Sequence, residues 1–168
     1  MQETGSTGTS GEFSQTALRC AVWLSLAGWV GGFALFAGMV APTAFQVLPR
    51  ELAGRIVSPI LEALHLYAAA AGVVLAVLAH KLGRSKLLRV LPLILACVCL
   101  YSQFGVTPRI NEARDLAFSP QGNPEALIAW GKLHARSMRL FTAAGLGGLL
   151  LLLLHARAEA RSFLRSGC

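Results

Sequence analysis

The chain has 168 residues, of which 55% are hydrophobic and 14% are charged. Because soluble domains usually carry about 25% charged residues, this composition excludes an ordinary soluble domain and favours a single membrane domain. The net charge of +7 would indicate a nucleic-acid partner in a soluble protein. Here most basic residues flank apolar runs, as they do where membrane proteins contact lipid headgroups. We therefore expect the lipid bilayer, and no nucleic acid, as the partner.

The first 16 residues are rich in Gly, Ser and Thr and include two acids. Such a composition cannot bury enough apolar surface to order itself, so residues 1–16 are predicted to form a disordered polar tail. The apolar run that follows is longer than the core of a secretory signal, and the tail before it is acidic rather than basic. We therefore expect no cleavage.

The first predicted span covers residues 20–41, which include no charged residue. At 1.5 Å per residue this run reaches ~33 Å, enough to cross a hydrocarbon layer of about 30 Å. Pro42 is predicted to end the helix. Residues 43–55 are then expected to form a polar connection with a turn around Pro49.

The second span is predicted at residues 56–79. It contains Glu62 and His65 in its first half, whereas its second half is uniformly apolar. The short loop that follows, residues 80–89, is basic and has no acidic residue.

The third span is predicted at residues 90–107. Pro92 is acceptable in the first turn of this helix, and Pro108 is predicted to close it. Residues 109–129 are mixed in composition and contain turn signals, so we expect a loop over much of this region.

The fourth span is predicted at residues 131–154. Its uncharged run, residues 140–154, is too short to cross a bilayer alone, so the helix must begin near Trp130.

Two faces of the residues before that run differ in composition. The three basic residues fall within about 60° of one another on a helical wheel: Lys132, Arg136 and Arg139. The opposite face carries His134, Ser137 and Phe141. A basic stripe towards headgroups and a second face turned into the bundle are typical of a helix leaving the bilayer.

These patterns predict an all-α fold, an integral membrane four-helix transmembrane bundle over residues 17–156, with a basic C-terminal tail at 157–168. Four spans place both termini on one side of the membrane. Basic residues on the two sides nearly balance, so the acid-free loop at 80–89 decides the orientation, and we expect both termini in the cytoplasm. Arginine outnumbers lysine twelve to three, a bias typical of GC-rich bacterial genomes. The expected location is therefore the bacterial inner membrane.

A candidate polar cluster lies towards the membrane face opposite the termini. Its members are Arg50, Glu62, His65, Gln103, Arg109, Asn111, His134 and Ser137. Ionisable groups near the hydrocarbon are costly unless they are paired or hydrated. We therefore expect Glu62 to approach Arg109 or Arg50, with His134 close by.

Several hypotheses for this cluster stay open. Glu62-x-x-His65 has the spacing of di-iron helical bundles, although the other spans supply no further carboxylates. His65 and His134 could also form an axial pair for haem. Alternatively, the cluster is a polar vestibule that binds or passes a small solute, or a network that clamps helix ends or a partner subunit.

No catalytic triad, phosphate loop or nucleotide fingerprint occurs in the sequence. We therefore predict a non-enzymatic membrane protein with no cofactor and no metal site. A metal- or haem-binding redox component is the alternative. Whether the chain pairs with another membrane protein or with a second copy stays open.

Four short motifs follow one another along the chain. They are Leu48-Pro49-Arg50, Ser58-Pro59, Pro108-Arg109 and Leu133-His134-x-x-Ser137. In these motifs and their order, from about residue 17 to 156, the sequence resembles the transmembrane protein 205-like family, small membrane proteins that carry a domain of unknown function. The resemblance implies a four-helix membrane domain with no known enzymatic activity. It does not extend to residues 112–129, where the loop is shorter than in some relatives.

Overall fold

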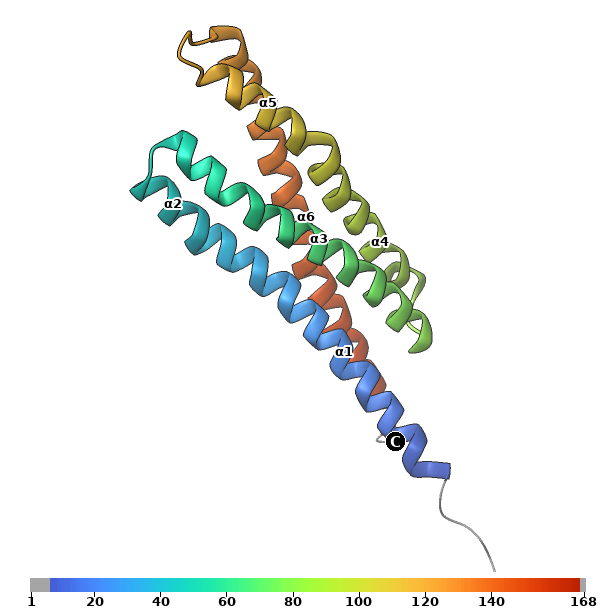
Figure 1. The fold of residues 1–168 in the computed structure, drawn as a ribbon. Coiled ribbons are helices and arrows are strands. Elements are labelled where there is room, and N and C mark those ends of the chain that lie inside the picture. The colour runs from blue at the N-terminus through green and yellow to red at the C-terminus, as the bar shows by residue number, and fades with distance from the viewer. Residues whose placement is uncertain (1–6, 167–168) are drawn as a thin grey trace, which may run out of the picture.

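The computed structural model describes the backbone of residues 7–166 and the side chains of residues 13–162 and 164. Within this range the chain is an elongated bundle of long helices (Figure 1). Its elements are α1 (Thr7–Leu35), the π-helical segment η1 (Phe36–Val40), α2 (Ala41–Val47), α3 (Arg50–Lys81), α4 (Lys86–Leu100), the π-helical segment η2 (Tyr101–Val106), α5 (Thr107–Ala117) and α6 (Pro124–Ser166).

These elements join into long apolar rods. In the described part of the chain, four helices are long and apolar enough to cross a membrane: Phe13–Val47, Arg50–Lys81, Lys86–Ala117 and Pro124–Ser162. The predicted all-α, four-span architecture is therefore confirmed, and each helix runs beyond its predicted span.

The bundle has two distinct ends (Figure 1). One holds the start of α1, the end of α6 and the turn between α3 and α4, and we call it the terminal end. The other, the distal end, holds the turn at residues 48–49 and the loop at residues 118–123. This up-and-down path follows directly from short connections between long apolar helices.

Two prolines that were predicted to end helices do not end them. The first rod continues past Pro42 through α2, and the third continues past Pro108 through α5. A π-helical segment stands before each proline, closed by a wide i→i+5 hydrogen bond, as from the N–H of Thr107 to the carbonyl of Ser102. Each proline then lies in the first turn of the next helix. There its missing N–H is not needed and its fixed φ suits the helix.

Both predicted tails, as far as the structure describes them, continue the neighbouring helices. Residues 7–16, predicted to be disordered, form the first turns of α1, and residues 157–166 form the last turns of α6. Extending an existing helix gains one hydrogen bond per residue fixed and needs no new nucleus. The apolar spans supply that nucleus. Residues 1–6 and 167–168 of the predicted tails lie outside the described residues.

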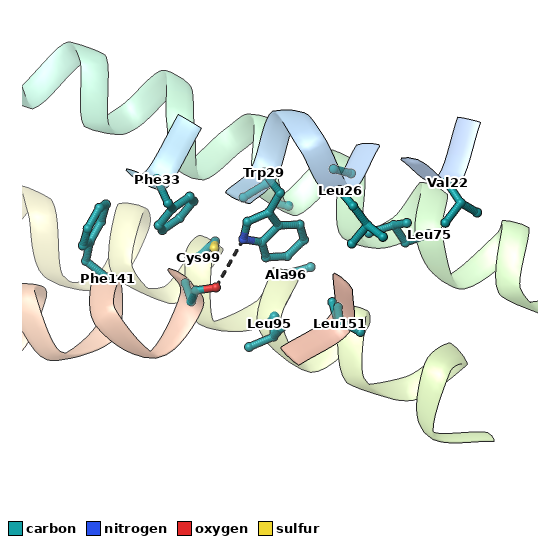
Figure 2. Packing of buried hydrophobic residues seen from close by; sticks show 14 of the residues in the cluster. Val22, Leu26, Trp29, Phe33, Leu75, Leu95, Ala96, Cys99, Phe141 and Leu151 are labelled. Atoms are coloured by element: carbon teal, nitrogen blue, oxygen red, sulfur yellow. Dashed lines mark hydrogen bonds between the residues drawn. The ribbon is translucent and has the colours of Figure 1, made fainter. Parts of the chain in front are cut away.

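The middle of the bundle is built around Trp29 of α1, which is fully buried (Figure 2). Its indole N–H donates a 3.2 Å hydrogen bond to the carbonyl of Ala144 on α6. Two glycines make room for this packing. A Cβ on Gly148 would lie 2.8 Å from the indole ring, and one on Gly72 would lie 2.7 Å from the Pro92 carbonyl oxygen. Such close approaches of a glycine to a neighbouring helix fix how each helix is rotated about its axis.

Candidate functional site

At the distal end the helices enclose a cavity of about 330 Å³, which we call the distal pocket. Residues of η1, α2, α3, α5 and α6 form its walls. The polar lining residues are Ser58, Thr107, Asn111, Arg114, His134 and Ser137. Most of the others are apolar or aromatic. A mainly apolar cavity of this size with a few converging polar groups is typical of a small-molecule site.

Aromatic rings form the wall nearest the middle of the bundle. The rings of Phe33 and Phe141 stack with their centroids 4.7 Å apart, and Phe36 lies 5.3 Å from Phe141. Phe33 and Phe141 face each other across the gap between α1 and α6 (Figure 2). These rings separate the pocket from the packing around Trp29.

The His134 ring is held in the wall by its neighbours on α6 and in the loop. It stacks on Trp130, one helical turn earlier, with centroids 5.4 Å apart, and Phe118 packs edge-on against that indole at 5.6 Å. The i, i+4 spacing brings the two α6 rings onto one face. Among the described residues, neither His134 nor Asn111 has a side-chain hydrogen-bond partner. Both groups are therefore available to a ligand.

Arg114 enters the same wall from α5, with its side chain 12% exposed. Its Nε lies 3.5 Å from a carboxylate oxygen of Asp115, which is 3.7 Å from the guanidinium of Arg55 on α3. Within the described part of the chain, that buried Nε makes no hydrogen bond. Asp115 thus links α5 to α3, and Arg114 keeps donor capacity at the pocket.

Two further members of the predicted cluster lie deeper in the bundle. His65 on α3 is 1% exposed, and its ring meets those of Phe33 and Phe141 edge-on at 6.3 and 6.5 Å. Gln103 on η2 is also buried and interacts with the imidazole. Neither ring nitrogen of His65 has a well-formed hydrogen bond to another described residue. This pair therefore lies behind the aromatic wall and does not line the pocket.

The predicted partners of Glu62 are not where the sequence suggested. Arg50, Glu62 and Arg109 are all exposed on the outside of the bundle, and no ion pair of Glu62 occurs among the described residues. The physical reason is helix rotation. The α5 residues that line the pocket are Thr107, Ile110, Asn111 and Arg114. At 100° per residue, Arg109 falls off that face. The predicted ion pair is therefore wrong, and the cluster divides into pocket, interior and surface groups.

Several pocket residues were not singled out from the sequence, notably Arg114 and Trp130. A signal for both exists in the helical spacing. Arg114 lies three residues after Asn111, and Trp130 lies four residues before His134, so each shares a face with a residue already chosen. A search one helical turn before and after each chosen residue would have identified Arg114 and Trp130.

The apolar helices and the pocket between them define a multi-pass helical membrane protein. More particularly, the chain belongs to the family described as a domain of unknown function, DUF4149, which matches residues 24–119, more than half of its length. No curated protein and no solved structure matches the chain. The match supports no closer assignment, so the resemblance to the transmembrane protein 205-like family stays an expectation. The matched region ends before α6, so His134 and Ser137 lie outside it.

Proposed function

We propose that the protein is a non-enzymatic membrane protein that binds a small amphipathic molecule in the distal pocket. The observation that carries this proposal is the set of pocket-lining polar groups, Asn111, His134 and Arg114, with unused hydrogen-bonding capacity among the described residues. Polar groups left unsatisfied against apolar walls cost free energy. A ligand that supplies the missing partners recovers that cost.

The lining indicates the chemistry of the ligand. Phe36, Phe45 and Phe141 offer an apolar surface for a hydrocarbon or ring body. The Asn111 amide and the Arg114 guanidinium offer donors to a head group that accepts hydrogen bonds. Donors of this kind fit a carboxylate or carbonyl best, since an Arg–carboxylate contact is charge-assisted.

Binding is favoured over passage through the bundle. Beyond the aromatic wall, the middle of the bundle is filled by Trp29, Leu75 and Leu151, each with 0% exposure. Interiors packed at this density admit no solute without rearrangement. The pocket is therefore closed towards the middle of the bundle.

The test uses 8-bromooctanoate, because a bromine atom quenches a nearby indole and Trp130 lines the pocket. We expect the purified protein in detergent to show saturable quenching that octanoate competes away and that octanol competes away at least tenfold less well. Equal competition by the acid and the alcohol, as expected for partition into the micelle, would contradict the proposal.

Variants localise the binding. Asn111→Leu and His134→Phe should each weaken the competition by octanoate about tenfold, since each removes a hydrogen-bonding group facing the ligand. The matched control is Arg109→Gln, on the same helix but exposed and outside the pocket. Its affinity should stay within about twofold of the parent protein. Equal losses in all three variants would place the probe elsewhere.

For the orientation we propose that both termini lie in the cytoplasm of a bacterial cell, so that the distal pocket faces the opposite side. The support is the basic, acid-free segment at residues 80–89, next to the membrane. A single cysteine placed at Ser85, in a chain lacking the native cysteines, should be labelled only by reagents that reach the cytoplasm. Labelling of intact cells by an impermeant maleimide would reverse the assignment.

The alternative, a metal- or haem-binding redox component, is supported by His65 alone. This residue is buried, interacts with Gln103, and has no well-formed hydrogen bond at either ring nitrogen among the described residues. Glu62 is exposed on the outer surface, so the Glu-x-x-His pair does not converge on one point. In the described residues no group of three or more His, Cys, Asp and Glu side chains is arranged to hold a metal. An absorption spectrum and metal analysis of the protein purified from membranes test this alternative directly.

A further inference from the structure

A second cavity lies at the opposite, terminal end of the bundle, and it is basic where the distal pocket is mainly apolar. We call it the terminal pocket. Its volume is about 640 Å³, and it lies between the α3–α4 turn, the start of α4 and the end of α6. Three arginines line it: Arg84, Arg157 and Arg161. Its apolar lining comes from Leu82, Leu87, Leu88 and Leu154.

The position of Arg84 is fixed by the turn that carries it. Gly83 adopts a left-handed conformation, with φ of 63°, and the N–H of Arg84 then bonds to the Ala79 carbonyl at 2.8 Å. The Arg84 carbonyl in turn accepts a 2.8 Å hydrogen bond from Arg89 Nε. This turn closes α3 and directs the Arg84 side chain towards α6.

The Arg84 side chain is only 10% exposed and pairs with Glu159, which also lies 3.7 Å from Arg19. A single carboxylate therefore serves two guanidinium groups. The Nε of Arg84 is buried and has no hydrogen-bond partner among the described residues. Arg157 and Arg161 are exposed, and neither has an ion pair within the part of the chain that the structure describes. The pocket thus carries an excess of positive charge.

A helix N-terminus adds to this charge. Ser85 is the N-cap residue of α4 and lines the pocket, yet its hydroxyl caps none of the α4 amides. The first amides of α4 therefore keep their hydrogen-bonding capacity, and the helix dipole favours an anion at this position. Arginines next to a helix N-terminus are the usual donors to a phosphate group.

We infer that the terminal pocket binds a phosphate-bearing anion. The phosphate contacts Arg157, Arg161 and the buried Arg84, and the leucines offer a surface to any apolar part of the ligand. Both a phospholipid headgroup and a soluble phosphate ester have this chemistry. The inference rests on the terminal end alone and does not depend on the distal pocket.

The experiment measures binding to the full-length protein in a neutral maltoside detergent by native mass spectrometry and by thermal stabilisation. One arm adds phosphatidylglycerol, with phosphatidylcholine as the zwitterionic comparison. A second arm adds glycerol 3-phosphate or inorganic phosphate. We expect at least one anion to bind saturably, and its binding to fall about tenfold in the double variant Arg157→Gln/Arg161→Gln.

The matched control is Lys81→Gln/Lys86→Gln, which removes two positive charges from the same end of the bundle but from residues outside the pocket. Its affinity should stay within about twofold of the parent protein, because surface charges act only through a screened potential. Loss confined to the phosphatidylglycerol arm identifies a lipid headgroup, and loss confined to the soluble arm identifies a phosphate ester. Equal losses in the two double variants, or no saturable binding of any anion, would overturn the inference.

Discussion

The two ends of the bundle differ in the burial of their ion pairs. At the terminal end, Glu159 of α6 pairs with Arg84, in the turn before α4, and with Arg19 of α1. These ion pairs connect the three segments. At the distal end, the helices are interrupted by η1 and η2, and Asn111 and His134 face a pocket without partners among the described residues. The distal end also has ion pairs, but Asp115, which pairs with Arg55 and Arg114, is 60% exposed. Breaking an ion pair should therefore cost more stability at the terminal end than at the distal end.

The largest expected effect on stability comes from the middle of the bundle, which connects the two ends. Trp29→Ala removes a fully buried indole and its hydrogen bond to Ala144. It should lower the free energy of unfolding by about 3–5 kcal/mol, measured by unfolding in mixed detergent micelles. Trp23→Ala is the control, since Trp23 is 37% exposed, and it should cost less than half as much. Equal losses of stability in the two variants would show that the packing around Trp29 is not the core shared by the two ends.

The second prediction makes the same chemical change at both ends. Glu159→Gln removes the partner of Arg84, which is nearly buried, and should cost about 2 kcal/mol. This is less than for a fully buried pair, because the Glu159 side chain is 23% exposed. Asp115→Asn at the distal end should cost less than about 1 kcal/mol, since Asp115 is 60% exposed. Thermal unfolding in one detergent compares the two variants. A larger loss of stability in Asp115→Asn than in Glu159→Gln would contradict the expected difference between the two ends.

A smaller effect on stability is expected inside the distal pocket. Asn111→Leu replaces a half-buried amide that has no protein partner among the described residues. Its free energy of unfolding without ligand should stay within about 0.5 kcal/mol of the parent protein, or rise, even though octanoate binding weakens. Parallel melts with and without octanoate measure both properties. A large loss of stability without ligand would identify Asn111 as a structural residue.

The smallest expected effect concerns Glu62 and Arg109. The sequence suggested an ion pair between them, but the structure shows none among the described residues. Since no ion pair of Glu62 occurs among the described residues, Glu62→Gln and Arg109→Gln should be additive. The coupling energy from the double-mutant cycle should stay below about 0.5 kcal/mol. A coupling above 1 kcal/mol would restore the direct contact that the sequence suggested.

The pattern of apolar runs and the positions of the prolines predicted most of the fold. Because the uncharged run at 140–154 is too short to cross a bilayer, the fourth helix was expected to begin before it. The helix α6 does begin earlier, at Pro124. Of the prolines, Pro49 marks a turn as expected, but Pro42 and Pro108 do not. The π-helical turns that precede these two prolines have no signature in composition, and Pro59 lies inside α3 without ending it.

The candidate site was predicted in part. Asn111, His134 and Ser137 line the pocket. His65 and Gln103 lie behind its aromatic wall, and the remaining three members of the predicted cluster are on the surface. Position along the bundle follows from position along a helix at 1.5 Å per residue. The direction of each side chain could not be predicted in the same way, because it depends on rotation about the helix axis.

The sequence by itself determined the class of protein and the number and order of the apolar helices that can span a membrane. These are local properties, since a bilayer requires each span to satisfy its own backbone hydrogen bonds and to be apolar over its own length. Only the tertiary structure decided which polar groups meet. The glycines around Trp29 fix the rotation of the helices, and the pairing of Arg84 with Glu159 joins residues 75 positions apart. Such contacts depend on how helices pack against one another, and apolar surface alone does not specify that packing inside a membrane.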